Sequence, residues 1–337
     1  MKVAVLKGGI SAEREVSLVS GSECARALRG EGFDVVEIDA HPDRIERDLR
    51  DVAPDVVFNA LHGDWGEDGA VQGVLERLRL PYTHSGVAAS KLAMNKDWAK
   101  DIFALHGITV PRGRIASRED IAQGGLLPVP YVVKPNGSGS SASVYLVHEE
   151  QQEVLEQIAR DDGLGSHPVI EPFIPGRELT VSVIGGEAIC VTEILPEGDW
   201  YDFEAKYAEG GSRHIVDVPL PDAVTRLALR HAETAHRALG CQGVTRADYR
   251  LDDRDWAHKA AESVTESDVV NGLVMLELNT QPGMTPTSLV PEQCAHRGLD
   301  FGPLCRWMVE DASWPREARA EAGRKAASPP MSGASAR

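Results

Sequence analysis

The stretch Met275-Leu276-Glu277-Leu278-Asn279-Thr280-Gln281-Pro282-Gly283-Met284-Thr285 predicts a buried strand that ends in a sharp turn. Alternate side chains of a strand point the same way, so Glu277 and Asn279 share one face while Leu276 and Leu278 face the core. A carboxylate and an amide there are hard oxygen ligands that suit Mg²⁺, which leaves its other positions to phosphates and water. The alternative is a strand end with solvated polar residues, and the rest of the chain decides between the two.

Composition limits the class of protein. The chain has 337 residues and a formal net charge of −17, which is enough length for two or three domains. Acidic residues are in excess and basic residues are dispersed, so we expect no nucleic-acid partner. Five cysteines without CxxC spacing indicate free, buried thiols in a reducing compartment. No signal-peptide pattern and no membrane-spanning apolar run is present, so we expect a cytoplasmic protein without a membrane partner.

Short apolar runs alternate with helical patterns and predict a parallel α/β layer over residues 1–89. The Gly8-Gly9 turn in this layer lacks GxGxxG spacing, so it does not predict a dinucleotide site. A second unit is expected over 90–169, beginning with a helix over 91–106, and a third over 170–312. Residues 313–337 are rich in Ala, Arg, Ser, Gly and Pro, and we expect them to be disordered.

A Gly- and Ser-rich loop at 136–143 joins two apolar strands in the second unit. Its small residues let main-chain N–H groups approach an anion, and Lys134 stands at its mouth. A flexible connector has the same composition. The position of the loop between two β-branched strands favours a phosphate-binding lid.

The chain as a whole resembles the D-alanine–D-alanine ligases, a family of ATP-grasp enzymes, over about residues 1–312. The resemblance rests on motifs in family order: GGISAEREVS (8–17), LHG (61–63), GEDG (66–69), MNK (94–96), GSS (139–141), PGRELTV (175–181), YDFEAKY (201–207), RAD (246–248) and ELNTQPGMTPTSL (277–289). It implies an α/β fold with an α+β ATP-grasp part. The three domains would be an N-terminal substrate domain, a central lid domain and a C-terminal catalytic domain.

The resemblance implies a reaction in which ATP phosphorylates one D-alanine and the amine of a second displaces phosphate, giving D-alanyl-D-alanine for peptidoglycan. A carboxylate has to attack an anionic phosphate, so the site must supply cations and N–H donors. Two Mg²⁺ ions, for which Mn²⁺ can substitute, are implied on Asp248, Glu277 and Asn279. The implied ATP-binding residues are Lys96, Lys134, Ser140, Ser141, Glu171, Phe173, Ile174, Glu178 and Lys206.

Within that set, the resemblance gives the base and the sugar separate partners. Glu171 and the main chain after it would read the adenine edge, with Phe173 among the apolar residues around the base. Glu178 would accept hydrogen bonds from the ribose hydroxyls, although an exposed turn acid is the alternative for this residue.

For the amino-acid substrates, the resemblance implies a further set of residues. Glu15 would hold the ammonium group of the first D-alanine, while Ser140 and Tyr207 hold its carboxylate and close the site. Arg246 and the N–H of Gly283 would stabilise the oxyanion of the tetrahedral intermediate. The remaining members are Ser288 and Leu289 for the second carboxylate, Lys206 for phosphate or that carboxylate, and His62 beside the acyl phosphate.

Three of these residues have structural alternatives. Glu15 can be a helix N-terminal acid favoured by the macrodipole. Arg246 can pair with Asp248 in a structural bridge, and Ser288 can be an ordinary N-cap.

The chain departs from the family pattern at several places. Ser138 stands where an acidic residue is common, Ser143 where glycine is common, and Pro172 where a basic residue is usual. The connection at 252–271 is longer than the usual hairpin, and we expect a polar surface insertion.

Two other functions remain open at this point. Tyr207 favours dipeptide over ester formation, but a related ligase for other amino acids is an alternative, as is a nucleotide-binding protein without catalysis. The resemblance also implies a homodimer formed through the N-terminal layer.

Overall fold

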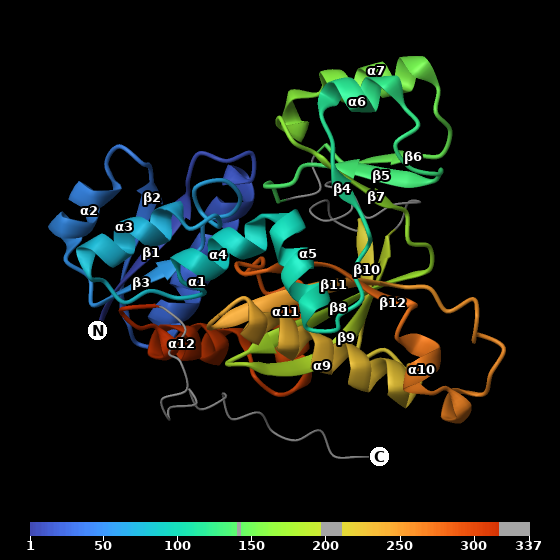
Figure 1. Ribbon diagram of the computed structural model, residues 1–337. Helices are drawn as coiled ribbons and strands as arrows, with labels where there is room; N and C mark the ends of the chain where they lie inside the picture. Colours follow the sequence, from blue (N-terminus) through green and yellow to red (C-terminus); the bar gives the residue numbers. More distant parts are fainter. Residues whose placement is uncertain (140–142, 197–210, 317–337) are drawn as a thin grey trace.

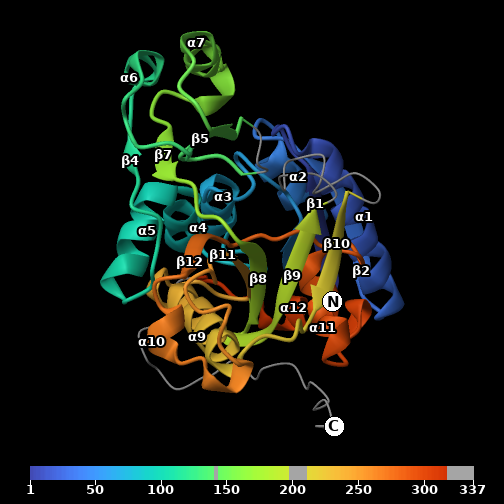
Figure 2. The same cartoon turned by 90° about the vertical axis from the view of Figure 1, so that its right-hand side faces the viewer.

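Three β-sheets organise the part of the chain that the computed structural model describes, residues 1–139, 143–196 and 211–316. A three-stranded sheet belongs to the N-terminal layer, a four-stranded sheet to the lid, and a five-stranded sheet to the C-terminal unit. Figure 1 shows the lid standing above the other two units, and Figure 2 shows the same arrangement from the side.

The N-terminal layer is the parallel α/β layer that the sequence predicts. It consists of β1 (Lys2–Gly8), α1 (Arg14–Gly30), β2 (Asp34–Ala40), α2 (Ile45–Val52), β3 (Val56–Asn59) and α3 (Ala70–Leu78). β1 lies between β2 and β3 and is parallel to both. The centre of β1 is fully buried, as expected for a parallel strand covered on both faces. The carboxyl ends of these strands therefore meet at one edge of the layer.

The helix predicted over 91–106 is two helices, α4 (Val87–Met94) and α5 (Lys96–Leu105). The prediction was wrong because Asn95 interrupts the periodic pattern. Its backbone is extended, and its Oδ1 accepts a hydrogen bond from the backbone N–H of Trp98 at 3.0 Å, which is an N-cap. This break places Lys96 at the N-terminus of α5.

The lid has its own small core. Its elements are β4 (Arg114–Ile115), α6 (Arg118–Gln123), β5 (Tyr131–Lys134), β6 (Tyr145–Val147), α7 (Gln152–Arg160), the 3-10 helix η1 (Asp162–Leu164) and β7 (Val169–Pro172). The sheet order is β4-β7-β5-β6, and all its pairs are antiparallel. The predicted hairpin around the Gly- and Ser-rich loop is confirmed as β5 and β6. α4 and α5 pack with the C-terminal unit rather than with this core, so the predicted unit 90–169 divides in its packing.

The C-terminal unit is built on an antiparallel sheet ordered β10-β9-β8-β11-β12. Its elements are β8 (Arg177–Ile184), β9 (Glu187–Pro196), β10 (Ser212–Val216), α9 (Asp222–Ala238), β11 (Val244–Leu251), the 3-10 helix η2 (Ala261–Ser263), α10 (Glu266–Val269), β12 (Leu273–Asn279), α11 (Leu289–His296) and α12 (Phe301–Asp311). α9 packs on one face through Val224, Leu227 and Ala228. α12 packs against the N-terminal layer, where Met308 shares a buried cluster with Val5 and Phe58.

The insertion at 252–271 is largely exposed, as predicted, but it is anchored. Trp256, Val264 and Val269 are buried in the same cluster as the sheet and α9. Between them, Thr265 and Asp268 form a capping box that begins α10. The insertion is therefore an ordered extension of the core, although most of its residues are polar, charged or small.

Residues 313–316 correct the prediction of a tail that is disordered from Ser313 onward. Ser313 forms an antiparallel bridge with Tyr82, and Arg316 is 2% exposed. The Arg316 Nε donates to the carbonyl of His84 at 2.7 Å, and its guanidinium also pairs with Asp311. A buried arginine with a carboxylate partner holds this segment on the N-terminal layer. The rest of the predicted tail, 317–337, lies outside the described residues.

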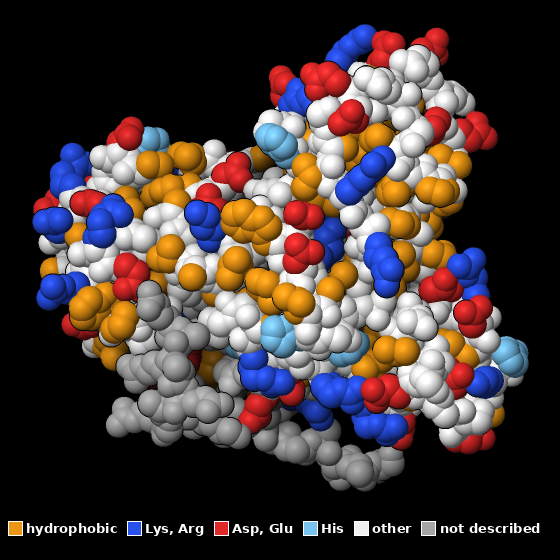
Figure 3. Space-filling view, in the orientation of Figure 1, with side chains coloured by type: hydrophobic (Ala, Val, Ile, Leu, Met, Phe, Trp, Pro, Cys, Tyr) orange, Lys and Arg blue, Asp and Glu red, His pale blue; other side chains and the backbone are white. Residues whose placement is uncertain are grey.

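The cysteines, the helices and the surface charge can each be compared with what the composition predicts. All five cysteines are buried and unpaired, as predicted. Among the described helices, none combines the length and the apolarity needed to cross a membrane. On the face shown in Figure 3, Lys and Arg side chains are mixed with Asp and Glu rather than gathered in one basic patch.

Candidate active site

A cleft of about 860 Å³, open to solvent, lies between the lid sheet and the β8-β11-β12 side of the five-stranded sheet. The predicted nucleotide-site residues within the described ranges all line it, with two predicted metal ligands: Lys96, Lys134, Glu171, Phe173, Ile174, Glu178, Asp248 and Glu277. Four predicted residues, Ser140, Ser141, Lys206 and Tyr207, fall outside the described residues.

Lys96 joins the lid to the C-terminal sheet. Because α5 begins at this residue, its side chain reaches both walls of the cleft: Nζ donates to the Ser138 carbonyl at 2.7 Å and lies 3.4 Å from Oε2 of Glu277. The start of the Gly- and Ser-rich loop is tied to the same helix end, since the Lys96 N–H donates to the Asn136 carbonyl at 3.0 Å. The predicted lysine is thus buried at the place where loop, helix and sheet meet.

Glu171 sits between two lysines. Its Oε2 is 2.5 Å from Nζ of Lys100, and its other oxygen pairs with Lys134. Burial disfavours the carboxylate, but the ammonium groups of Lys134 and Lys100 outweigh burial and hold the pKa of Glu171 below its ordinary value. The side chain is therefore engaged with cations, which leaves only the main chain of this strand for a base edge.

Lys100 is a residue that the sequence interpretation missed. It is one helical turn after Lys96, so both ammonium groups lie on one side of α5. That spacing is the available signal, but a second lysine on a helix is usually exposed, whereas Lys100 is only 6% exposed.

Arg250 is a second missed residue of the cleft. Its guanidinium carbon is 5.7 Å from the centre of the Phe173 ring, which is cation–π geometry, and Nη1 is 3.2 Å from Oε2 of Glu178. Glu178 therefore lines the cleft as part of an ion pair and is not an isolated turn acid. Arg250 lies two residues after Asp248 on β11, so the strand period alone places both on one face.

The three predicted metal ligands lie on neighbouring strands. In the β11–β12 register, Asp248 is opposite Glu277 and Arg246 is opposite Asn279. Arg246 donates to both oxygens of Asp248, at 2.9 and 2.7 Å, and Thr180 donates to Oδ1 at 2.7 Å. The structural bridge left open for Arg246 is therefore present.

This donor set fits a hard cation. Two carboxylates on directly opposed strand positions repel each other unless positive charge lies nearby, and carboxylate and amide oxygens are what Mg²⁺ prefers. The Asn279 amide would supply a third oxygen, because Asn279 lies two residues after Glu277 on β12. That oxygen accepts from the Gln281 N–H at 2.7 Å, which fixes its orientation.

A second hollow of about 330 Å³ adjoins the cleft and shares Lys96, Gly139 and Glu277 with it. Glu67 and Asn279 also line it. It lies where the N-terminal layer faces the end of β12, so a ligand there would be next to one in the main cleft.

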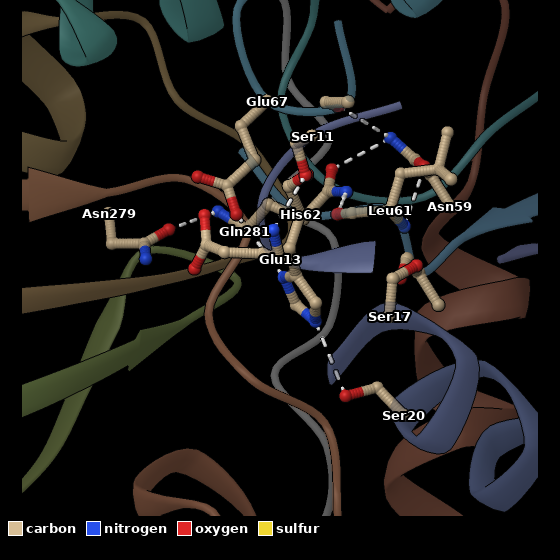
Figure 4. A network of polar contacts seen from close by, with 12 residues as sticks. Ser11, Glu13, Ser17, Ser20, Asn59, Leu61, His62, Glu67, Asn279 and Gln281 are labelled. Atoms are coloured by element: carbon tan, nitrogen blue, oxygen red, sulfur yellow. Dashed lines mark hydrogen bonds and ion pairs between the residues drawn. The ribbon is translucent and has the colours of Figure 1, made fainter. Parts of the chain in front are cut away.

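His62 is buried close to this hollow. Its Nδ1 is 3.2 Å from Oε1 of Glu67 and its Nε2 is 3.3 Å from Oγ of Ser20. Burial disfavours the imidazolium, but Glu67 and then Glu13 outweigh burial and raise the pKa of His62. Figure 4 shows the side chains of Glu13, His62 and Glu67 gathered together.

The acid that α1 brings to this site is Glu13 rather than the predicted Glu15. Glu15 is exposed in the first turn of α1, whereas Glu13 precedes the helix and is 6% exposed. Its carboxylate fills space left by glycines, because a Cβ on Gly63 would lie 2.7 Å from its Oε2 and one on Gly139 would lie 3.3 Å away. Glu15 is exposed in the first turn of α1, which is the position that the helix-macrodipole alternative describes for it.

The turn after β12 leads to a helix start, as predicted. α11 begins at Leu289 with Ser288 at the N-cap position. The Ser288 hydroxyl does not cap the helix; it accepts from the Thr285 N–H at 3.0 Å. The first N–H groups of α11 therefore lack that side-chain acceptor, which is the condition for binding an anion. Gly283 lies against this serine, since a Cβ there would be 3.1 Å from its hydroxyl.

Ser143, which replaces a common family glycine, has a positive φ of 57°. This left-handed conformation favours glycine over residues that carry a Cβ. A hydrogen bond between the serine side chain and Asp161, together with the Tyr145 hydroxyl at 2.7 Å from Oδ2, lowers the pKa of Asp161 against the effect of burial. Ser143 thus adopts a backbone conformation that is unfavourable for serine, and its side chain bonds to Asp161 at the start of η1.

Comparisons with known proteins agree with the geometry. Models for the N-terminus and the C-terminus of D-ala D-ala ligase match residues 39–85 and 114–310. The D-alanine–D-alanine ligase of Ruegeria sp. (strain TM1040) is 52% identical over 315 residues, covering 94% of this chain and 97% of the relative. That of Dinoroseobacter shibae is 53% identical, covering 94% and 96%.

Solved structures give the same result. The D-alanine–D-alanine ligase from Bacillus anthracis complexed with ATP matches with a TM-score of 0.75 and 28% sequence identity, covering 93% of this chain and 97% of that one. Another structure of the ligase from this organism matches with a TM-score of 0.76.

Replacing Lys100 tests the charge arrangement around Glu171. In Lys100→Met, Glu171 stays buried with one ammonium instead of two, so we expect the free energy of unfolding at pH 7 to fall by about 2 kcal/mol. The lowered pKa of Glu171 means that its contribution is present above the pKa of the unfolded chain and is lost as pH falls through the folded-state value. The difference between variant and wild type should therefore shrink below about pH 4.

Urea unfolding at both pH values measures this. Lys91→Met, which removes an exposed lysine from α4, is the matched control and should behave like wild type. Equal unfolding midpoints for the two variants at pH 7 would contradict the arrangement.

Proposed function

The chain belongs to the D-alanine–D-alanine ligase family, and we propose that its two adjoining hollows carry out ATP-dependent joining of two D-alanines through an acyl phosphate. The observation that carries the proposal is the cleft with lysines on its helix and lid side and opposed carboxylates on its sheet side, next to a hollow lined by Glu67, whose carboxylate contacts buried His62. The main cleft would take ATP and the second hollow the first D-alanine. The dipeptide product is a building block of peptidoglycan.

Different groups of the cleft are assigned to the phosphates, the base and the sugar of ATP. Lys96 and Lys134 would neutralise phosphate oxygens, which is the main electrostatic requirement of phosphoryl transfer. The main chain after Glu171 would read the adenine edge, with Phe173 and Ile174 beside the base. Glu178 would accept from the ribose hydroxyls, because its carboxylate lines the same cleft.

Mg²⁺ is proposed on Asp248, Glu277 and Asn279, because Asp248 is opposite Glu277 in the β11–β12 register and Asn279 is two residues further along β12. When bound, it would neutralise charge on the transferring phosphate. Each of the two acids also has a cationic side chain beside it, since Arg246 pairs with Asp248 and Lys96 lies near Glu277.

For the amino acids, we assign the ammonium group of the first D-alanine to Glu13 instead of Glu15. The carboxylate of this D-alanine would attack the terminal phosphate of ATP, which releases ADP and leaves an acyl phosphate. The amine of the second D-alanine would then attack the acyl carbon, lose a proton and displace phosphate. Arg246 and the Gly283 N–H would donate to the oxyanion of that step. The free start of α11 at Ser288 and Leu289 would bind the second carboxylate.

We also propose that the chain acts as a homodimer in the cytoplasm. Ile10 and Val19 are exposed apolar side chains on the N-terminal layer, 54% and 56% exposed, and the unpaired cysteines fit a reducing compartment. Gel filtration of the soluble cell fraction should recover the chain at about twice 36.4 kDa. Recovery with membranes, or at the monomer mass, would contradict this.

The reaction is tested by ADP release from Mg²⁺-ATP, with the mass of the product recorded. We expect release that depends on D-alanine, fails with L-alanine or without an amino acid, yields the D-alanyl-D-alanine mass and stops when a chelator removes the metal. Release with a different amino acid would support the nucleotide site but change the assignment of the amino-acid substrate. No release under any condition would favour a noncatalytic nucleotide-binding protein.

The assignment of Glu13 has a matched pair of variants two residues apart. Glu13→Gln removes a buried charge that would face the ammonium group, so kcat/KM for D-alanine should fall on the order of 100-fold. Glu15→Gln changes an exposed acid and should leave kcat/KM within about two-fold. Steady-state kinetics with saturating ATP measure both. The reverse ranking of the two variants would return the role to Glu15.

A further inference from the structure

Gln281 joins the C-terminal sheet to the N-terminal layer at the active site. It lies in the turn after β12, between Asn279 and Gly283, and its side chain is 1% exposed. The side chain leaves its own unit and enters the N-terminal layer, as Figure 4 shows. A polar side chain buried across a boundary in this way needs partners on the other side.

Both ends of the Gln281 amide have such partners. Asn59 Nδ2 donates to its Oε1 at 2.8 Å, and its Nε2 donates to the carbonyl of Leu61. Its main-chain N–H meanwhile donates to Oδ1 of Asn279 at 2.7 Å. One residue therefore contacts both a proposed metal ligand and the strand end that leads to His62.

The partners of Gln281 in turn fix the loop over 61–67. Asn59 Nδ2 also donates to the Gly66 carbonyl at 3.1 Å, and Asn59 Oδ1 accepts from the Leu61 N–H at 3.2 Å. His62 follows Leu61 directly, and Glu67 follows Gly66. The same amide contacts thus hold the backbone next to His62 and Glu67, the buried side chains beside the proposed site of the first D-alanine.

These contacts have a chemical consequence. The acyl carbon forms on the D-alanine that the N-terminal layer holds, whereas the Gly283 N–H that stabilises its oxyanion belongs to the C-terminal turn. A misplacement of about 1 Å between such groups can cost on the order of 100-fold in rate. Neutral amides hold this spacing without adding charge to a site that already contains several acids.

We propose that Gln281 is a positioning residue that sets the spacing between the first-substrate side, formed by the 61–67 loop, and the Asn279–Gly283 turn. The proposal rests on the proposed function, since it assigns the alignment of that reaction. If the alignment is loosened, water competes with the second amine for the acyl carbon. Phosphate then leaves, D-alanine is regenerated, and ADP is released without dipeptide.

The test is Gln281→Met, which keeps the volume and removes both side-chain hydrogen bonds. We expect the KM for D-alanine to rise on the order of 10-fold and the ratio of ADP to dipeptide to rise above that of wild type, while the KM for ATP stays within about two-fold. Gln281→Asn keeps the neutral amide but shortens the side chain by one methylene, which weakens both side-chain hydrogen bonds, so its ratio should be intermediate. It decides the question if Gln281→Met does not fold.

Gln72→Met is the matched control. Gln72 is also 1% exposed and donates to the Gly66 carbonyl at 2.9 Å, but it belongs to α3 and makes no bridge between the units. It should lower stability while leaving the ADP-to-dipeptide ratio unchanged. A wild-type ratio and wild-type KM values in the folded Gln281 variants would overturn the proposal, as would an equal change in Gln72→Met. Failure of the wild-type protein to form dipeptide would instead overturn the proposed function.

Discussion

The pairing of β11 with β12 determines where the charged groups of the active site stand. This pairing puts Asp248 opposite Glu277 and Arg246 opposite Asn279, with Thr180 of β8 on the far side of Asp248. Two carboxylates at directly opposed positions repel each other, so the sheet carries a charge conflict that its own backbone cannot remove. Arg246 offsets one carboxylate and Lys96, from α5, approaches the other. The sheet edge thus depends on cations, both in the folded chain and, in the proposed reaction, from the metal.

The opposite wall of the cleft has an excess of positive rather than negative charge. Lys100 and Lys134 share the single buried carboxylate of Glu171, which leaves more positive than negative charge on this side. In the proposed reaction, an anionic nucleotide carrying a divalent cation would match both walls at once, with phosphates toward the lysines and the cation toward the acids. Neither wall would bind such a ligand well alone, because each would leave one of its charges without a partner.

Period and turn chemistry predict the parallel layer, the β5–β6 hairpin and the start of α11 at Leu289, because each depends on residues close in sequence. The continuous helix over 91–106 fails because one Asn95 side chain caps a new helix against the periodic pattern. Glu13 is buried and Glu15 is exposed because α1 begins between them, and a shift of one or two residues in a helix start is below what periodicity resolves. Lys100 is buried against Glu171 and Arg316 against the His84 carbonyl, both distant in sequence, and long basic side chains give no local sign of such contacts.

The two boundaries around the active site differ in physical kind. The N-terminal layer and the C-terminal unit share an apolar cluster that includes Val5, Phe58 and Met308, and neutral amides complete their junction. The lid has a separate cluster and meets the rest of the site through lysines, as in the contact of Lys100 with Glu171. Close-packed apolar contacts resist changes in spacing, whereas polar interfaces between domains more readily permit relative motion. The amino acids, which must meet within bonding distance, would therefore be held by the fixed boundary, and the nucleotide by the one whose contacts are charged.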